Sequence, residues 1–171
     1  MFPEFGLPYT LVGHSERRHT VSSESDKLVN AKVLSSLKAG LKVVLCFGET
    51  LAQREANKTI EVVEQQLKVA LEGVAVSDLG KIVFAYEPVW AIGTGKNATP
   101  AQAQEVHAEI RKILTAKYSL AIATASIVIY GGSVKPANCV DLIKQPDVDG
   151  FLVGGCSLKP DFLKIIASVC Q

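Results

Sequence analysis

The chain of 171 residues is 48% hydrophobic, which suits one domain with a sizeable core and is too apolar for a disordered protein. Its 18 basic and 17 acidic residues leave a formal net charge of +1, so the overall charge gives no reason to expect nucleic acid or an anionic membrane as a partner. Attraction for an anionic substrate would have to be local.

The cysteines and the apolar segments narrow the class of protein further. The four cysteines lack the spacing of a metal site, and Cys46 lies in an apolar run typical of a buried, inert thiol. We therefore expect no metal and a reducing compartment. The first residues lack a signal-peptide pattern, and the apolar run at 120–130 is too short to span a membrane. Together these features favour a soluble, cytoplasmic protein.

Short apolar runs alternate with longer segments of helical period along the whole chain. In chain order, the pattern predicts a strand at Tyr9–Val12, a helix at Ser25–Ala39, a strand at Lys42–Cys46, a helix at Thr59–Glu72, a strand at Ile82–Tyr86, a helix at Pro100–Lys117, a strand at Ile127–Tyr130, a helix at Pro136–Ile143, a strand at Gly150–Val153 and a helix at Asp161–Val169. Gly40 suits the end of the first helix, and Thr99-Pro100-Ala101-Gln102 reads as a capping box that opens the third.

Five strand–helix units in strict alternation predict an α/β fold with a parallel sheet and right-handed crossovers. The strands are almost continuously apolar, as expected of parallel strands buried on both faces. No linker or low-complexity tract divides the chain, so we expect a single domain over residues 1–171. Periodicity alone leaves open whether the sheet is doubly wound or part of a barrel.

Four motifs, each placed directly after a predicted strand, carry a resemblance to a known family. They are Gly13-His14-Ser15-Glu16-Arg17-Arg18, the segment from Ala85 to Lys96, Tyr130-Gly131-Gly132-Ser133 and Val153-Gly154-Gly155. In this order they resemble triosephosphate isomerases, from about Leu7 to Ile166. The resemblance implies a partial (β/α)8 TIM barrel made of units 4–8, with the first three units absent and residues 1–6 matching the end of the preceding helix.

The resemblance implies two catalytic residues, Glu87 and His14. Glu87 would be the general base, because a carboxylate near the carbons beside a carbonyl can remove and return a proton. His14 would polarise that carbonyl as a neutral imidazole. Ser15 and Glu16 could open a helical turn whose backbone N–H groups face the ring. His19 and His107 lack such a context, and we expect them at the surface or in packing.

The segment after Glu87 resembles the lid that closes over the substrate in this family. Proline stiffens its start, glycines free its end, and Trp90 and Ile92 are expected to exclude water from the site. The lid residues are Pro88, Val89, Trp90, Ala91, Ile92, Gly93, Thr94, Gly95 and Lys96.

Backbone N–H groups are expected to hold a phosphate, because glycine lets an anion approach the chain closely. The resemblance implies that the substrate-binding residues are Gly93, Ser133, Gly154 and Gly155. It also places Glu16 behind the site as a supporting residue, together with further ion-pair residues of the family, which are matched here by Arg17, Arg18, Glu49 and Arg54.

The resemblance implies interconversion of dihydroxyacetone phosphate and D-glyceraldehyde 3-phosphate through an enediol, in glycolysis and gluconeogenesis, by a homodimer without cofactor. The family's first-strand Asn-x-Lys motif has no equivalent, since Asn30-Ala31-Lys32 lies in a predicted helix, and the family's main interface loop has no equivalent either. We therefore expect the isolated chain to be weak or inactive. The alternative is a non-catalytic, truncated fragment that acts only through a complementary chain. Another phosphate-binding barrel enzyme fits the His and Glu motifs less well.

Overall fold

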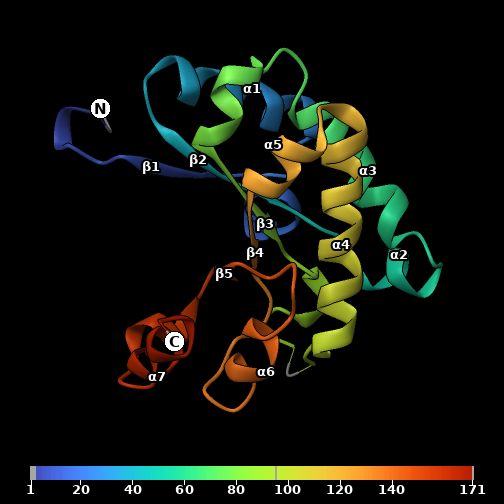
Figure 1. Ribbon diagram of the computed structural model, residues 1–171, viewed down its shortest axis with the longest axis vertical. Coiled ribbons are helices and arrows are strands. Elements are labelled where there is room, and N and C mark those ends of the chain that lie inside the picture. The colour runs from blue at the N-terminus through green and yellow to red at the C-terminus, as the bar shows by residue number, and fades with distance from the viewer. Residues whose placement is uncertain (1–2, 95, 171) are drawn as a thin grey trace.

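The computed structural model describes residues 3–94 and 96–170, so the expected lid residue Gly95 lies outside the described part of the chain. Its centre is one parallel sheet with the strand order β1–β2–β3–β4–β5 (Figure 1). The strands are β1 (Tyr9–Val12), β2 (Lys42–Phe47), β3 (Ile82–Tyr86), β4 (Ile127–Tyr130) and β5 (Gly150–Phe151). An α/β fold with five parallel strands in one sheet is consistent with a partial TIM barrel.

Helices connect successive strands and close the chain. They are α1 (Asp26–Lys38), α2 (Leu51–Glu55), α3 (Thr59–Ala70), α4 (Pro100–Lys117), α5 (Leu120–Ala125), α6 (Cys139–Ile143) and α7 (Phe162–Val169). Shorter 3-10 turns are Pro3–Phe5, Val76–Lys81, Val89–Ala91 and Gly155–Leu158, and Arg17–Val21 forms a π-helical turn. The capping box at the start of α4 is confirmed, since Thr99 and Gln102 exchange side-chain to backbone hydrogen bonds. Gly40 ends α1 with φ +80°, a conformation that favours glycine.

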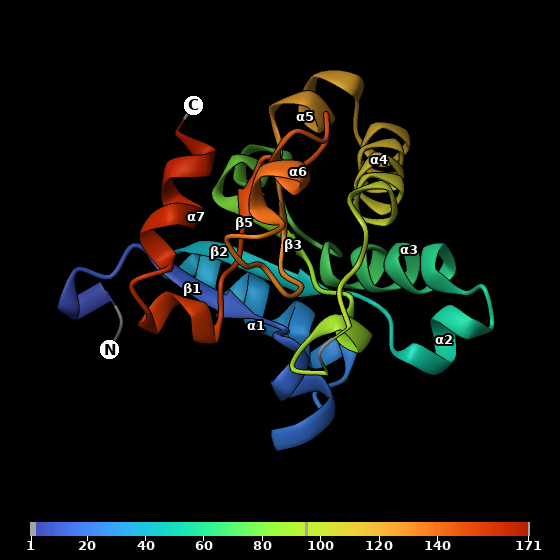
Figure 2. The ribbon, with the colours of Figure 1, turned by 90° about the horizontal axis from the view of Figure 1, so that it is seen from below.

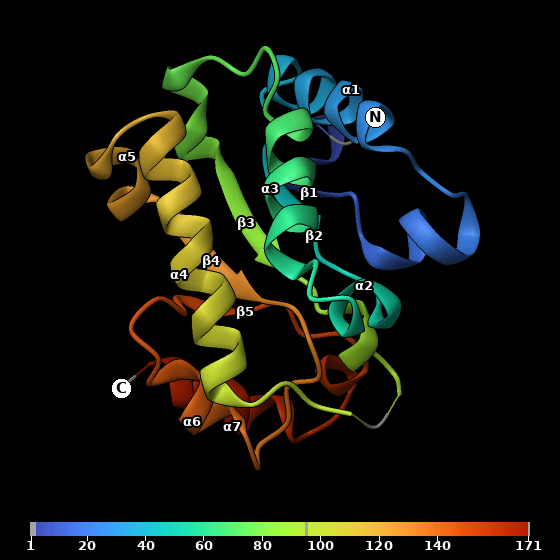
Figure 3. The ribbon, with the colours of Figure 1, turned by 90° about the vertical axis from the view of Figure 1, so that its right-hand side faces the viewer.

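One face of the sheet carries the hydrophobic core. The register aligns Val12, Leu45, Phe84 and Val128 in one row across four strands, and all four side chains are buried. Buried side chains of the helices pack on this face, among them Val33, Leu67 and Ile110. Figure 3 shows α3 and α4 side by side across the strands, and α6 and α7 lie together near β5 (Figures 1 and 3).

The expectation that the strands are buried on both faces is confirmed only in part, because Cys46 and Ala85 on the second face are fully buried whereas a neighbouring row on that face is not. The alternate row, on the opposite face, holds Leu11, Val44, Val83 and Ile127, and none of these side chains is fully buried. Leu11 and Ile127 are each 50% exposed. In the described residues β1 and β5 each pair with one neighbour only, so the sheet has two open edges (Figure 2), and its second face is exposed at the row of Leu11 and Ile127.

Several boundaries differ from the predicted ones for local reasons. β5 ends at Phe151 rather than at Val153, because Phe151 pairs with Tyr130, the last residue of β4. α6 begins at Cys139 rather than at Pro136, because the Asn138 side chain holds the preceding residues in a turn by accepting from the N–H of Lys135 at 2.8 Å.

Two short helices were not predicted at all. α2 is opened by a capping box in which the Thr50 hydroxyl and the Gln53 side chain each accept a backbone hydrogen bond, a sequence signal that was overlooked. α5 begins at a Ser119 cap that accepts from Ile122 N, so it divides the apolar run at 120–130 into a helix followed by β4.

Candidate active site

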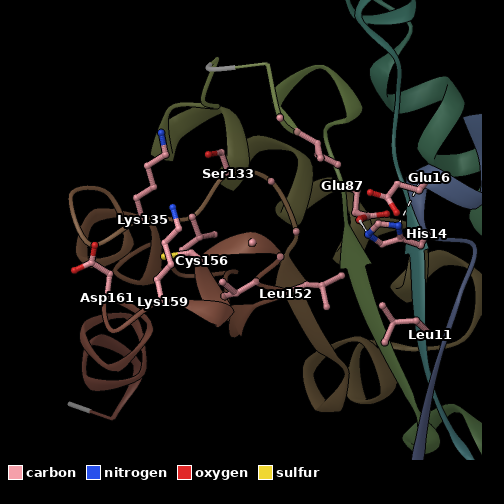
Figure 4. Close-up of a pocket in the computed structure, with 18 of the residues that line it drawn as sticks. Leu11, His14, Glu16, Glu87, Ser133, Lys135, Leu152, Cys156, Lys159 and Asp161 are labelled. Atoms are coloured by element: carbon pink, nitrogen blue, oxygen red, sulfur yellow. Dashed lines mark hydrogen bonds and ion pairs between the residues drawn. The ribbon is translucent and has the colours of Figure 1, made fainter. Parts of the chain in front are cut away.

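The loops at the carboxyl ends of β1, β3, β4 and β5 surround one cavity of about 660 Å³ (Figure 4). The parallel strands explain this convergence, because their carboxyl ends meet at the same edge of the sheet. The cavity brings together the following residues singled out from the sequence: His14, Glu16, Glu87, Ile92, Gly93, Ser133, Gly154 and Gly155. Of the described lid residues, only Ile92 and Gly93 line it.

Glu87 is a buried carboxylate whose two oxygens are held by the loop after β1. Only 2% of the residue is exposed. Its Oε2 accepts a hydrogen bond from the backbone N–H of Ser15 at 2.9 Å, and its Oε1 lies 3.1 Å from Nε2 of His14. The backbone of Glu87 is fixed as well, because its N–H donates to the carbonyl of Phe47 at 2.8 Å. The expected base and electrophile, 73 positions apart in the chain, are therefore in direct contact.

The orientation of His14 is set by the turn that follows it. The backbone N–H of Glu16 donates to Nδ1 of His14 at 3.3 Å, as the sequence led us to expect. A ring nitrogen that accepts a hydrogen bond carries a lone pair, so the ring proton lies on Nε2, the nitrogen that faces Glu87. His14 is thus arranged as a hydrogen-bond donor toward the cavity.

Burial raises the pKa of Glu87 above its ordinary value of 4.5. The nearby ring of His14, the N–H of Ser15, the charge of Arg18 and the thiol of Cys46 oppose that shift in decreasing order, without cancelling it. A raised pKa makes the carboxylate a stronger base than an exposed glutamate. Cys46 is buried, as expected, and burial together with Glu87 raises its pKa well above the usual range, which keeps the thiol unreactive.

Two glycines allow this close arrangement. A Cβ atom on Gly48 would lie 1.9 Å from the carbonyl oxygen of Glu87, and one on Gly131 would lie 2.9 Å from Cγ of Glu87. Only residues without a side chain fit at these two strand ends. Sequence reasoning missed the role of Gly48, although a glycine directly after a buried strand is a signal of close backbone approach.

A buried carboxylate, that of Glu49, anchors the lid through Trp90. Glu49 is fully buried and accepts hydrogen bonds from Trp90 Nε1 at 2.8 Å and from the hydroxyl of Tyr86 at 3.0 Å. Arg54 forms an ion pair with Glu49 at 3.3 Å and lies 4.7 Å from the centre of the Trp90 ring. Trp90 therefore points to Glu49 and does not line the cavity. In this conformation Ile92 lines the site, and the exclusion of water by Trp90 stays a prediction for the closed lid.

The opposite end of the cavity presents backbone and hydroxyl groups. Ser133, Gly154 and Gly155 follow β4 and β5, and Gly93 approaches from the lid with φ +68°. No atom lies within 4 Å of the place where a Cβ of Gly154 or Gly155 would be, so this backbone is open to a bound group. Lys135 and Lys159 also line this end. They were not singled out from the sequence, because a lysine in a loop carries no signal of where its side chain lies.

The remaining charged and titratable residues singled out from the sequence form ion pairs, pack in the interior or lie at the surface. The guanidinium of Arg18 donates to the backbone of Gly13 at 2.7 Å and pairs with Asp26 at 2.6 Å, while Arg17 pairs with Glu24 at 2.8 Å. His107 is buried in α4, as a packing residue should be, and His19 is exposed. Among the described residues, no group of three or more His, Cys, Asp or Glu side chains is arranged to hold a metal ion.

A family model described as triosephosphate isomerase matches residues 1–169. The chain belongs to the triosephosphate isomerase family. Membership implies isomerase activity at the level of the family and a small phosphate-bearing substrate. Within residues 3–94 and 96–170, no helix is both long and apolar enough to cross a membrane.

Proposed function

We propose that this protein interconverts dihydroxyacetone phosphate and D-glyceraldehyde 3-phosphate through an enediol intermediate. One observation carries the proposal. A buried carboxylate with a raised pKa, Glu87, touches a histidine, His14, whose donor nitrogen faces the same cavity. A base beside a hydrogen-bond donor is what proton abstraction next to a carbonyl requires.

In the proposed reaction, Glu87 removes a proton from the carbon beside the substrate carbonyl, and Nε2–H of His14 donates a hydrogen bond to the carbonyl oxygen. The electron pair of the broken C–H bond forms the carbon–carbon double bond, and the carbonyl oxygen takes the proton from Nε2 of His14, which gives the enediol. The same nitrogen then takes the proton of the other enediol hydroxyl, while Glu87 returns its proton to the carbon that carried the carbonyl, so that the new carbonyl forms on the neighbouring carbon. The substrate enters between the two side chains, so their 3.1 Å contact opens when it binds. No cofactor takes part in these steps.

The phosphate group of the substrate is placed at the other end of the cavity, on the N–H groups of Gly93, Gly154 and Gly155 and the hydroxyl of Ser133. Ser133, Gly154 and Gly155 lie in the loops that follow the last two strands of the sheet, the place where barrels of this kind commonly bind phosphate. Closure of the lid would bring Ile92 and Gly93 over the substrate and keep water from the enediol, which loses phosphate when it is exposed.

We expect slow turnover from this chain. Leu11, on the wall of the cavity, is 50% exposed, and the sheet edge at β1 is unpaired in the described residues. Water in an open site weakens the hydrogen bond from His14 and lowers the basicity of Glu87, compared with a site that is closed to water. The proposed reaction is a step of glycolysis and gluconeogenesis, and on that ground we propose a cytoplasmic enzyme that, as in its family, pairs as a homodimer.

The test is conversion of dihydroxyacetone phosphate by the purified chain, by Glu87→Gln and by Glu55→Gln, a matched change on the exposed surface of α2. We expect slow conversion that Glu87→Gln reduces by about 10²–10⁴, the usual contribution of a general base, and that Glu55→Gln leaves unchanged. Conversion that is equal in all three proteins would show that another group, or contamination, is responsible.

The open sheet favours a second candidate, a non-catalytic fragment that acts only with a complementary chain. Tyr9 and Leu11 are half-exposed on edge strand β1, and edge strands pair readily with other chains. Absence of Glu87-dependent conversion, together with a stable complex formed by this chain and a polypeptide supplying strand–helix units, would favour this candidate over the enzyme.

A further inference from the structure

Two lysines in the cavity have no counter-ion. Lys135 lies in the loop between β4 and α6, and Lys159 lies between the Gly155–Leu158 turn and α7. Within the described part of the chain, no carboxylate lies within ion-pair distance of either ammonium group. Asp161, the carboxylate nearest in sequence to Lys159, is paired instead with Lys164 at 3.0 Å. The positive charge of the two lysines is therefore not neutralised by any residue that the structure describes.

The two ends of the cavity consequently carry groups of different charge. Figure 4 shows His14 and Glu87 on one wall, and Lys135 and Lys159 across the cavity on the side of Ser133. The two lysines belong to the loops that also supply Ser133 and the Gly154–Gly155 pair. Backbone N–H groups present only partial charges, whereas an ammonium group adds a full, movable positive charge.

We propose that Lys135 and Lys159 form the charged part of the phosphate subsite and select a doubly charged phosphate group. The proposal rests on the proposed function and adds to it, because it assigns the cation of the subsite to residues of this chain. The ammonium groups attract the dianion electrostatically, while Ser133 and the glycine N–H groups fix its position. The substrate is thereby oriented with its phosphate away from Glu87, whose negative charge would repel it.

The test is the binding of inorganic phosphate to the full chain, which is measured by phosphorus NMR titration at low ionic strength. The variants are Lys135→Gln, Lys159→Gln and, as a matched control, Lys38→Gln at the far end of α1. All three lysines are exposed, so these changes should leave folding intact. We expect each pocket variant to weaken phosphate binding by about two- to fivefold, the double variant by about tenfold, and the control not at all. Added salt should reduce the difference.

Equal weakening in the control and pocket variants would overturn the proposal, because it would show non-specific attraction. Unchanged phosphate binding in Lys135→Gln and Lys159→Gln would also overturn it. Failure of the wild-type chain to bind phosphate would overturn it as well. The titration involves no turnover, so it separates this proposal from the proposed reaction. Glu87→Gln is expected to bind phosphate at least as well as wild type, since it removes a negative charge from the cavity, while losing conversion.

Discussion

At the scale of single residues, burial and hydrogen bonding act in opposite directions on the charge of Glu87. Burial penalises its charge, while the N–H of Ser15 and Nε2 of His14 stabilise that charge from the loop after β1. The net effect is a raised pKa, so the carboxylate binds a proton more tightly than an exposed glutamate and still has donors that orient it. A base that must take a proton from carbon benefits from both properties.

The pH dependence of proton transfer should reveal this shift. Only ionised Glu87 can accept a proton, so the rate falls as the pH drops through its pKa. Because burial raises that pKa, the acid limb of the pH–rate profile should lie above the ordinary value of 4.5. The measurement is the initial rate of dihydroxyacetone phosphate conversion across the acid range. An acid limb at or below the ordinary value would contradict the burial argument.

Sequence reasoning identified His14, Glu87 and Ser133 because each follows a predicted strand within a distinctive local pattern. It could not identify Lys135 and Lys159, since their role depends on which side chains lack a counter-ion in the folded chain. It also gave no sign of the contact that holds Trp90 in this conformation. The partner of Trp90, the buried Glu49, lies 41 positions away and becomes apparent only when both are placed in space.

At the scale of elements, the approach of β2 to β3 positions Glu87. Gly48, directly after β2, lies so close to the carbonyl of Glu87 that no side chain fits between them. The N–H of Glu87 donates to Phe47, the last residue of β2, at 2.8 Å. The carboxylate is therefore positioned by two strand ends as well as by the hydrogen bonds to its side chain.

We predict that Gly48→Ala destabilises the protein and moves Glu87. Its Cβ would meet the Glu87 carbonyl at 1.9 Å, so the strand ends must shift, at a cost of about 3 kcal/mol in the free energy of unfolding. The matched control is Gly80→Ala, because no atom lies within 4 Å of a Cβ there, and its effect should stay within about 1 kcal/mol. Urea unfolding of both variants measures the difference. Equal stability would show that the loops adjust freely.

The elements that sequence predicted best are those bounded by strong local signals. α4 has its predicted limits because Thr99, Pro100 and Gln102 form a complete start signal. β5 and α6 were misjudged because their limits depend on a strand partner and on the side-chain hydrogen bonds of Asn138, both of which are tertiary facts.

At the scale of the whole molecule, one face of the sheet forms a closed core and the other face is covered only in part in the described residues. The core includes a histidine, His107, whose Nδ1 lies 3.0 Å from the carbonyl of Asp147 and whose buried Nε2 has no hydrogen-bond partner among the described residues. The carbonyl can only accept, so Nδ1 carries the proton and the ring is neutral. Burial is the main cause that lowers the pKa of His107, to about 4.

This buried histidine should make the fold sensitive to acid. The unfolded chain binds a proton at His107 near pH 6.5, whereas the folded chain does so only near pH 4, so stability is lost as the pH falls through that window. Between pH 7.5 and pH 5 the loss from this residue is about 2 kcal/mol. Urea unfolding at both values should show that His107→Gln removes this part of the decline. An unchanged decline in the variant would rule out His107 as its cause.

The parallel pairing of the strands followed from the alternation of strands and helices, whereas the strand order and the partial exposure of one face did not. Leu11 and Val12 are both apolar, yet Val12 is buried under the helices and Leu11 is half-exposed. Hydrophobicity along a strand shows that it suits burial, and only the neighbouring elements decide whether each face is covered.

The central claim is that Glu87 transfers a proton to and from substrate carbon. The most direct measurement is NMR detection of deuterium entering dihydroxyacetone phosphate in heavy water, with wild type, Glu87→Gln and Glu55→Gln at equal concentration. Exchange is observed even when overall turnover is slow. We expect slow deuterium incorporation by wild type and by Glu55→Gln, and a rate of incorporation that is lower by about 10² or more in Glu87→Gln. Incorporation unaffected by Glu87→Gln, or no incorporation by wild type above the protein-free sample, would contradict it.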